Sequence, residues 1–336
     1  MNDAEPDAVQ RRCLVVTPAA DLGRLILSLP TLEALAASGR RLVVLTEGTS
    51  VPLLRLAPAA PEALVPSSSG AETRSAVGAA RCGEAVVLCR TLEAAWFVRA
   101  TGIPLRWGYG GGLRRLLLNR PVRRPAIGLR HACDDFRELL EAMDAALSHS
   151  AAQGIAPDPR LVLSEPWHER ARERLERAHV RPDGSPLVGI YAGVRGGGSG
   201  RPWPRRSFEE LLRRLRRRRP EIRWIILATT EDLWTAVRLF EETAKIHPVI
   251  GPDLRLDGLA AVLAQLDLFL GADSWMLQLA AAAGTRSLGL FAREPRRWAP
   301  RGQGHRVVAK ASLGLIAVDE VMEVFEQVWT TMPMGR

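Results

Sequence analysis

The segment 266–291, LDLFLGADSWMLQLAAAAGTRSLGLF, constrains the fold more than any other part of the chain. An apolar run is followed by a Gly-Ala pair and Asp273-Ser274, then by an Ala/Leu-rich stretch ending at Gly284 and a second apolar run. This order predicts a strand, a tight turn, a helix capped by Asp273 or Ser274, and a second strand. A helix that starts just past a strand offers free N–H groups and a positive dipole end to a phosphate. An ordinary crossover that binds nothing is the alternative interpretation.

Strand-like apolar runs alternate with helical segments along the whole chain. The predicted strands are 13–18, 41–46, 84–89, 104–109, 186–193, 223–230, 247–250, 266–270 and 287–291. The predicted helices are 22–37, 91–101, 131–148, 165–179, 207–219, 231–243, 257–265, the helix after Ser274, and 318–331. Such alternation predicts an α/β protein with parallel sheets covered by helices on both faces. We expect two doubly wound, Rossmann-like domains that face each other across a cleft.

Proline-rich and charged stretches suggest where the domains begin and end. We expect a disordered leader over 1–11, an N-terminal domain over 12–163 and a C-terminal domain over 164–317, with residues 318–336 as a helix packing back toward the N-terminal domain. The acidic, polar first residues do not resemble a signal peptide. No apolar run approaches the roughly 20 residues that a membrane-spanning helix needs.

Charge and cysteine usage narrow the class of protein further. The formal net charge is +9, and all but two of the 46 basic residues are arginine. This balance favours anionic partners, although no aromatic-studded basic groove points to a specific nucleic acid. The four cysteines, Cys13, Cys82, Cys89 and Cys133, show no CxxC spacing, so we expect reduced thiols in a cytoplasmic protein. The scattered histidines predict no metal site.

The segment after the strand 266–270 also resembles a known donor-site signature. In glycosyltransferase family 9, the ADP-heptose:lipopolysaccharide heptosyltransferases, Asp-Thr/Ser-Gly-x-x-His-Leu-Ala-Ala-Ala precedes a glycine. The matching positions here are Asp273, Ser274, Leu279, Ala280, Ala281, Ala282 and Gly284. Two positions depart from the signature, because Trp275 stands at the glycine and Gln278 at the histidine.

The first loop resembles the same family with one change at the catalytic position. The family has Leu-Gly-Asp after its first strand, and this chain has Leu22-Gly23-Arg24. The family's aspartate is expected to take the proton from the acceptor hydroxyl, which an arginine cannot do at neutral pH. Asp21, three residues earlier, is therefore our candidate for the general base. The alternative role for Asp21 is to cap the helix that follows.

The second half of the chain supplies the remaining candidates for a donor site. Arg201-Pro202-Trp203-Pro204 resembles the family's Lys-x-Trp-Pro, so Arg201 would stabilise the leaving diphosphate as a second catalytic residue. Glu231 stands where the family holds the ribose, and Leu254 where an apolar side chain backs the adenine. The full predicted donor site is Gly193, Val194, Arg201, Glu231, Leu254, Asp273, Ser274, Trp275, Met276 and Gln278.

The resemblance implies a GT-B fold and an inverting transfer of a heptose or related sugar. The donor would be an ADP-sugar and the acceptor a hydroxyl on an anionic glycolipid, a small molecule or a protein, with no cofactor or metal. Membrane contact would be peripheral at most. Two other functions stay open: a degenerate relative that binds a nucleotide sugar or partner without turnover, and an anion- or nucleic-acid-binding module that uses the arginine-rich segment 110–130.

Overall fold

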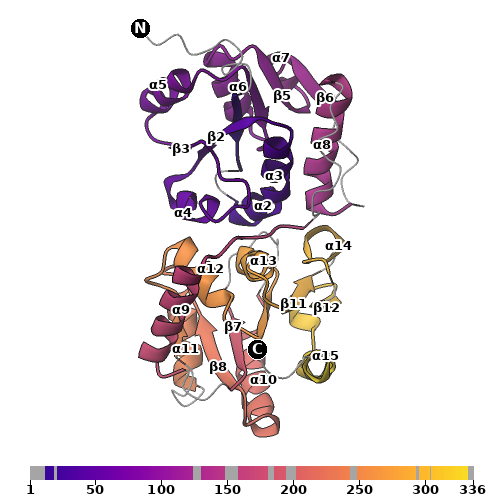
Figure 1. Cartoon of the computed structure of the whole chain (residues 1–336). Helices are drawn as coiled ribbons and strands as arrows, with labels where there is room; N and C mark the ends of the chain where they lie inside the picture. The colour runs from indigo at the N-terminus through magenta and orange to yellow at the C-terminus, as the bar shows by residue number, and fades with distance from the viewer. Residues whose placement is uncertain are drawn as a thin grey trace. The chain divides into compact units, whose positions relative to one another are not determined.

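The chain divides into two compact units, Met1–Pro159 and Arg160–Arg336 (Figure 1). The computed structural model describes residues 12–18, 21–123, 130–147, 158–180, 185–193, 202–242, 248–292, 295–302 and 304–331. The predicted leader, 1–11, lies outside the described residues.

The first unit contains a six-stranded parallel sheet in the order β3-β2-β1-β4-β5-β6. Its strands are β1 (Arg12–Val16), β2 (Arg41–Thr46), β3 (Ala63–Pro66), β4 (Glu84–Val87), β5 (Leu105–Gly110) and β6 (Arg120–Arg123). Strands β1 and β4 have no exposed residue, because helices cover both faces of a parallel sheet. The central strands therefore consist of continuous apolar runs such as Cys-Leu-Val-Val in β1.

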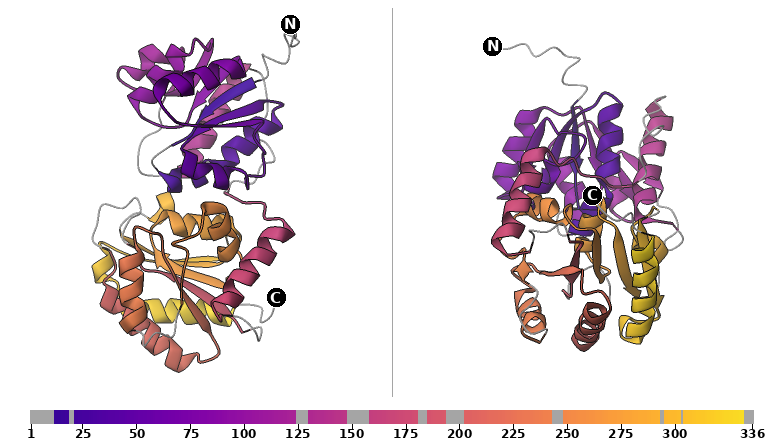
Figure 2. Two further views of the ribbon diagram at one scale, coloured as in Figure 1. Left: turned by 90° about the vertical axis from the view of Figure 1, so that its left-hand side faces the viewer. Right: turned by 60° about the horizontal axis from the view of Figure 1, so that its bottom comes forward.

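Helices of the first unit lie on both sides of this sheet (Figure 2). They are α2 (Leu22–Leu27), α3 (Leu29–Ala37), α4 (Val51–Leu54), α5 (Gly70–Ala80), α6 (Leu92–Ala100), α7 (Arg114–Leu117) and α8 (Ala132–Leu147), with a 3₁₀ turn at Gly48–Ser50. One core cluster joins α5, α6 and α7 to alternate residues of the strands, among them Leu14, Val43 and Val87. Helix α8 contacts α2, α3 and β5.

The predicted helix 22–37 is two helices in the structure. Ser28 lies between α2 and α3, and Pro30 occupies the first turn of α3. Proline has no N–H to donate to the carbonyl one turn earlier, so it favours the start of a new helix over the interior of a long one.

Several elements of the first unit were not predicted. Strand β6 lies in the segment 110–130, for which the sequence suggested only loop and a short helix, and that short helix is α7. β6 reads Arg-Pro-Val-Arg and is largely exposed, because it is an edge strand held by backbone pairing with β5. Strand β3 is also short and ends at Pro66, so neither strand carries a clear apolar pattern.

The second unit repeats the architecture with a second six-stranded parallel sheet. Its order is β12-β11-β10-β7-β8-β9. The strands are β7 (Leu187–Tyr191), β8 (Arg223–Leu227), β9 (Val249–Ile250), β10 (Leu268–Ala272), β11 (Ser287–Ala292) and β12 (His305–Lys310), of which β12 was not predicted. The predicted α/β fold with two doubly wound parallel sheets is confirmed.

The helices of the second unit also cover both faces of their sheet. They are α9 (Glu165–Arg177), α10 (Arg205–Arg218), α11 (Leu233–Glu242), α12 (Leu256–Leu263), α13 (Trp275–Ala282), α14 (Pro295–Trp298) and α15 (Val318–Thr330), with a 3₁₀ turn at Leu313–Leu315. Helices α10, α11 and α15 share the larger core cluster with the sheet. Helix α12 contacts α9 and α13, and α13 contacts β10 and β11.

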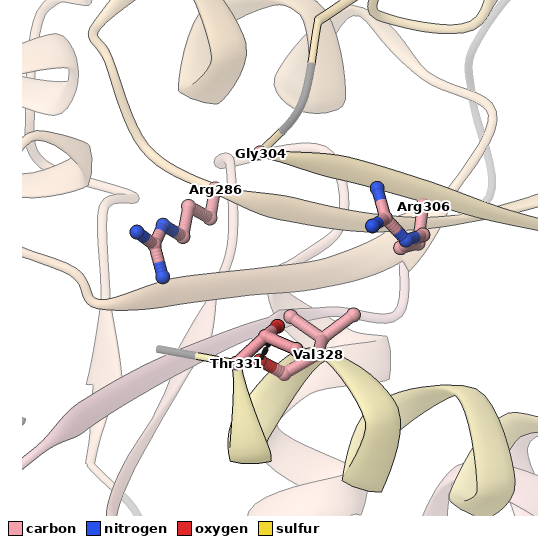
Figure 3. Close-up of a pocket in the computed structure, with 5 residues that line it drawn as sticks. All are labelled: Arg286, Gly304, Arg306, Val328 and Thr331. Atoms are coloured by element: carbon pink, nitrogen blue, oxygen red, sulfur yellow. Dashed lines mark hydrogen bonds between the residues drawn. The ribbon is translucent and has the colours of Figure 1, made fainter. Parts of the chain in front are cut away.

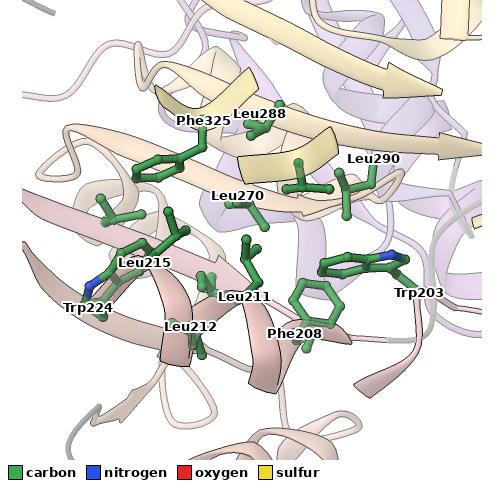
Figure 4. Packing of buried hydrophobic residues seen from close by; sticks show 14 of the residues in the cluster. Trp203, Phe208, Leu211, Leu212, Leu215, Trp224, Leu270, Leu288, Leu290 and Phe325 are labelled. Carbon is green, nitrogen blue, oxygen red and sulfur yellow. The ribbon is translucent and has the colours of Figure 1, made fainter. Parts of the chain in front are cut away.

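The last helix, α15, belongs to the core of the second unit. Its buried residues include Val321, Phe325 and Trp329, which lie on one helical face. The Phe325 ring stacks between Trp224 of β8, with ring centres 5.8 Å apart, and Trp329, at 5.6 Å (Figure 4). The expectation that residues 318–336 pack back toward the N-terminal domain stays a prediction. The apolar face of α15 matches the apolar faces of α10 and the sheet, and it is buried there.

We expect Phe325→Ala to lower the free energy of unfolding of the second unit by about 3–5 kcal/mol, the usual cost of removing a buried aromatic ring. Urea denaturation followed by circular dichroism measures this change. The control is Leu315→Ala, because Leu315 is exposed and its truncation should cost less than about 0.5 kcal/mol. Equal small losses for both variants would contradict a core role for α15.

Candidate functional site

The second sheet has a topological switch point between β7 and β10. The chain runs from β7 outward to β8 and β9, and then returns to the other side of β7 to form β10, β11 and β12. Strands β7 and β10 pair in parallel, so Gly193 follows one strand and Asp273 the other at the same edge. In doubly wound sheets, ligands bind outside the carboxyl ends of the strands at such a point.

Helix α13 starts at this edge with a capped N-terminus. Ser274 is the cap, and its hydroxyl accepts a hydrogen bond from the backbone N–H of Leu277 at 3.3 Å. The backbone N–H of Asp273 donates to the Leu290 carbonyl at 2.9 Å, which fixes the turn against β11. The predicted strand–turn–helix–strand order of segment 266–291 is confirmed, with Ser274 as the capping residue. The other N–H groups in the first turn of α13 and the positive end of its dipole favour the binding of an anion.

Three other predicted donor-site residues lie on α13 itself. Trp275, the first residue of the helix, is half-buried, whereas Met276 is fully buried. Gln278 is also buried, and its side-chain amide donates to the backbone carbonyl of Trp298 at the end of α14. This bond gives Gln278 a structural role that links α13 to α14.

A buried polar cluster joins the carboxyl ends of β7 and β8. The Tyr191 hydroxyl donates to the Asp232 carboxylate, which also accepts from the Thr229 hydroxyl at 2.8 Å. Burial, followed by the bond to Asp232, raises the pKa of Tyr191, so the phenol keeps its proton and remains a donor. A methyl group at Gly193 would lie 2.2 Å from the Tyr191 ring. The loop after β7 therefore rests on this ring, and only glycine fits there.

Sequence reasoning missed the pairing of Tyr191 with Asp232 and named only the neighbouring Glu231. Glu231 is exposed at the end of β8, next to the buried Asp232. One signal was present in the sequence, because Tyr191 is one of only two tyrosines and ends an apolar strand.

Leu254 lies past the end of the neighbouring strand, β9. Its backbone N–H donates to the Gly251 carbonyl at 2.9 Å, and its side chain is half-buried. Gly251 has φ +120°, and a methyl group there would lie 2.4 Å from the Ala228 carbonyl oxygen, so this close turn requires glycine. The Thr230 hydroxyl donates to the Pro252 carbonyl at 2.9 Å and ties the two loops together. Glu231 and Leu254 thus follow adjacent strands at the same sheet edge as Gly193 and Asp273.

Arg201 and Val194 lie outside the described residues, which resume at Pro202. The next residue, Trp203, is fully buried, and its indole N–H donates to the Ile316 carbonyl at 3.0 Å. Its ring meets Phe208 edge to face, with centroids 4.6 Å apart (Figure 4). The tryptophan of the Arg-Pro-Trp-Pro sequence is therefore a core anchor, which fixes the chain two residues after Arg201.

In the first unit, Asp21 caps helix α2. One carboxylate oxygen accepts the backbone N–H of Arg24 at 3.0 Å, and the other lies 3.1 Å from its guanidinium Nε. The capping role, which the sequence analysis left open, is therefore the one present in the structure. The Asp21 side chain is nevertheless 45% exposed.

A second polar cluster lies at the carboxyl edge of the first sheet. Its switch point falls between β1 and β4, and Arg90 follows β4 there. The Arg90 guanidinium pairs with the Asp135 carboxylate at 2.8 Å, and the Tyr109 hydroxyl donates to the backbone carbonyl of Asp135. His131, at the start of α8, accepts the Cys133 N–H on Nδ1 at 3.3 Å.

One cavity, of about 410 Å³, lies at the amino ends of β11 and β12, the edge opposite the switch point. Arg286 and Arg306 line it together with Val328 and Thr331 (Figure 3). The last two residues belong to the C-terminal end of α15, where the helix dipole attracts cations, so these arginines need no bound anion.

In the residues that the structure describes, no three His, Cys, Asp or Glu side chains gather as metal ligands would. In the same part of the chain, no helix is long and apolar enough to cross a membrane.

Two doubly wound units, one with a capped helix N-terminus at its switch point, define the GT-B class of fold. The sequence model of glycosyltransferase family 9 (heptosyltransferase) matches residues 74–320, and the chain belongs to this family of glycosyltransferases. No curated protein sequence matches the chain.

Solved structures agree with this assignment at the level of the fold. The chain is 20% identical to E. coli ADP-heptose lps heptosyltransferase II, with a TM-score of 0.79 over 95% of this chain and 98% of that one. The chain is 17% identical to a family 9 glycosyl transferase from Veillonella parvula, with a TM-score of 0.82 over 97% of this chain and 99% of that one. It is 20% identical to E. coli heptosyltransferase WaaC with ADP-2-deoxy-2-fluoro heptose, with a TM-score of 0.71 over 94% of this chain and 99% of that one.

We expect Gly193→Ala to destabilise the second unit by about 1–3 kcal/mol, since the new methyl group overlaps the Tyr191 ring. In a Tyr191→Ala background the same change should cost almost nothing, because the overlap is gone. Urea denaturation of the four proteins in this double-mutant cycle gives the coupling energy. An equal cost in both backgrounds would show that the Tyr191 ring does not support the loop.

Proposed function

We propose that this glycosyltransferase transfers a heptose or related sugar from an ADP-sugar to an acceptor hydroxyl with inversion at the anomeric carbon. The observation that carries the proposal is the carboxyl edge of the second sheet. There the N-terminus of α13 lies at the switch point, and the adjacent strand ends that carry Glu231 and Leu254 lie along the same sheet edge. No separate cofactor is proposed.

The diphosphate of the donor is assigned to the start of α13. The first-turn N–H groups and the dipole of this helix favour the negative charge that develops when the diphosphate leaves. On β7, the strand paired with β10, the Tyr191 ring packs against Gly193. A glycine there lets a ligand approach the backbone closely.

The nucleoside is assigned to the ends of β8 and β9. Glu231 is exposed and offers carboxylate oxygens to ribose hydroxyls, and Leu254 offers an apolar surface to a base. The bond from Thr230 to Pro252 holds the two loops together. ADP is the proposed nucleotide because the E. coli heptosyltransferase WaaC, a protein of the same fold, has been solved with ADP and with ADP-2-deoxy-2-fluoro heptose.

The reaction breaks the bond between the anomeric carbon and the diphosphate and forms one from that carbon to the acceptor oxygen. The acceptor hydroxyl loses its proton to a base, and the diphosphate leaves with the electron pair. Arg201 is the proposed cation for the leaving group, since it precedes the anchored Trp203 by two residues and is fully charged at neutral pH. Asp21 is the proposed base, as the only carboxylate between β1 and α2.

The class of acceptor is proposed from the net charge of the chain, and the cellular compartment from its cysteines. The basic balance of the chain favours an anionic acceptor such as a phosphorylated glycolipid. A cytoplasmic site is proposed because the four cysteines are free thiols, and burial raises the pKa of Cys82 to about 11.

A degenerate relative that binds the donor without turnover is the second candidate. The observation that favours it is the contact between Asp21 and Arg24, which occupies both carboxylate oxygens of the proposed base. Both contacts hold the Asp21 carboxylate against the start of its own helix, as a capping role requires.

We expect ADP to raise the melting temperature of the protein more than UDP or dTDP at equal concentration. A ligand that binds only the folded protein stabilises it, and the nucleotide with the highest affinity gives the largest shift. Thermal-shift measurements with the full chain test this. Equal shifts for all nucleotides would count against an adenine pocket at Leu254.

Arg201→Ala should weaken ADP binding by about 1.5–3 kcal/mol, the scale of a lost charge-assisted hydrogen bond. Isothermal titration measures the affinity. Arg206→Ala is the matched control, since Arg206 is an exposed arginine at the start of α10 and should leave ADP binding unchanged. The same affinity for both variants would remove Arg201 from the site.

Asp21→Asn separates an enzyme that uses this base from a protein that uses Asp21 only as a cap. Loss of a positioned base should lower turnover of an ADP-sugar about 10²- to 10⁴-fold with ADP affinity unchanged. Stability should change little, because asparagine caps a helix nearly as well as aspartate. Asp134→Asn, in the first turn of α8 in the same unit, is the control. An Asp21→Asn protein with wild-type turnover would exclude Asp21 as the base.

A further inference from the structure

Four large apolar side chains are exposed together on the first unit. Leu92 and Trp96 lie one turn apart on α6 and are 41% and 56% exposed. Leu113 and Leu116, at the start of α7 and within it, are 64% and 74% exposed. Helices α6 and α7 contact each other. We call these four residues the α6–α7 surface.

Two internal arginines hold the two helices of this surface together. Arg114, which is buried, donates to the carbonyls of Thr91 and Cys89 just before α6. Leu92 and Leu113 are the sequence neighbours of the two residues in this contact, Thr91 and Arg114. At the other end, Arg106 donates to the Leu117 carbonyl at 3.0 Å and to the Ile103 carbonyl at 2.7 Å. The surface is thus one rigid feature.

The charged residues around the α6–α7 surface are almost all positive. Residues 90–123 contain seven arginines and one carboxylate, Glu93. Arg99 lies one turn beyond Trp96, and Arg115 stands beside Leu116; both are exposed. Arg120 and Arg123 of the edge strand β6 are exposed as well. Apolar side chains flanked by solvent-exposed arginines are the composition of a surface that lies in the interface of an anionic bilayer.

We propose that the α6–α7 surface docks onto an anionic lipid membrane. Trp96 and the three leucines would enter the headgroup region, and Arg99 and Arg115 would pair with lipid phosphates. A second copy of the chain is a poorer occupant, because a two-fold contact would bring the same arginines face to face. A nucleic acid would pair with the arginines but would leave the leucines without a partner.

This inference does not depend on the donor nucleotide or on the sugar that is transferred. It assigns a partner to a surface of the first unit. The proposed donor-site residues all lie in the second unit, and only the proposed base, Asp21, lies in the first.

The test is co-sedimentation of the full chain with vesicles. Phosphatidylglycerol mixed with phosphatidylcholine is compared with pure phosphatidylcholine, at low and at high salt. We expect binding to the anionic vesicles, weakened by salt, and little binding to the neutral ones. The double variant Trp96→Ser, Leu116→Ser should bind anionic vesicles at least about tenfold more weakly, since it removes two of the inserted apolar groups.

Trp234→Ser is the matched control. Trp234 is 73% exposed on α11 of the second unit, and the Arg238 guanidinium carbon lies 5.9 Å from its ring, so it is also an exposed tryptophan beside an arginine. This variant should bind vesicles like the wild type. A second variant, Arg99→Gln with Arg115→Gln, should lose the preference for anionic lipid.

Three results would overturn the proposal. The first is sedimentation that is equal with neutral and anionic vesicles or equal in all variants. The second is a dimer in analytical ultracentrifugation that the Trp96→Ser, Leu116→Ser variant dissociates. The third is absence of vesicle binding together with salt-sensitive binding to RNA. Unchanged melting temperatures across the variants would show that each one is folded.

Discussion

The parallel pairing of β7 with β10 is the constraint on which the second unit depends. The chain continues from β7 to β8 on one side and returns to form β10 on the other side of β7. Gly193 and the N-terminus of α13 therefore lie where the strand order reverses. The proposed donor site is thus a consequence of strand order, and the side chains refine it.

Buried polar contacts make this edge rigid. The carboxylate of Asp232 accepts from Tyr191 and Thr229, and the hydroxyl of Ser274 caps α13. These groups are satisfied within the protein, so they position the edge without depending on a ligand. Glu231, the residue proposed to bind the ribose, is exposed beside this framework. An edge organised before binding loses less free energy to ordering when a donor arrives.

Arginine has three distinct roles in the first unit. Arg114 and Arg106 donate to backbone carbonyls and join α6 to α7. Arg24 pairs with Asp21, the proposed base, at the start of α2. Arg99 and Arg115 are exposed beside apolar side chains and give that surface its charge. The same guanidinium group serves all three because its planar set of donors stays charged in each environment.

The sequence alone determined the α/β class, both parallel sheets and the capped start of α13, because apolar periodicity and capping residues are local signals. The edge strand β6 was not predicted, since backbone pairing with β5 holds it more than apolar side chains do. Only the tertiary structure decided that Asp232 pairs with Tyr191, and that α15 lies in the second unit. Such contacts join residues far apart in the chain, and their geometry depends on how whole faces pack. Local sequence patterns do not specify that packing.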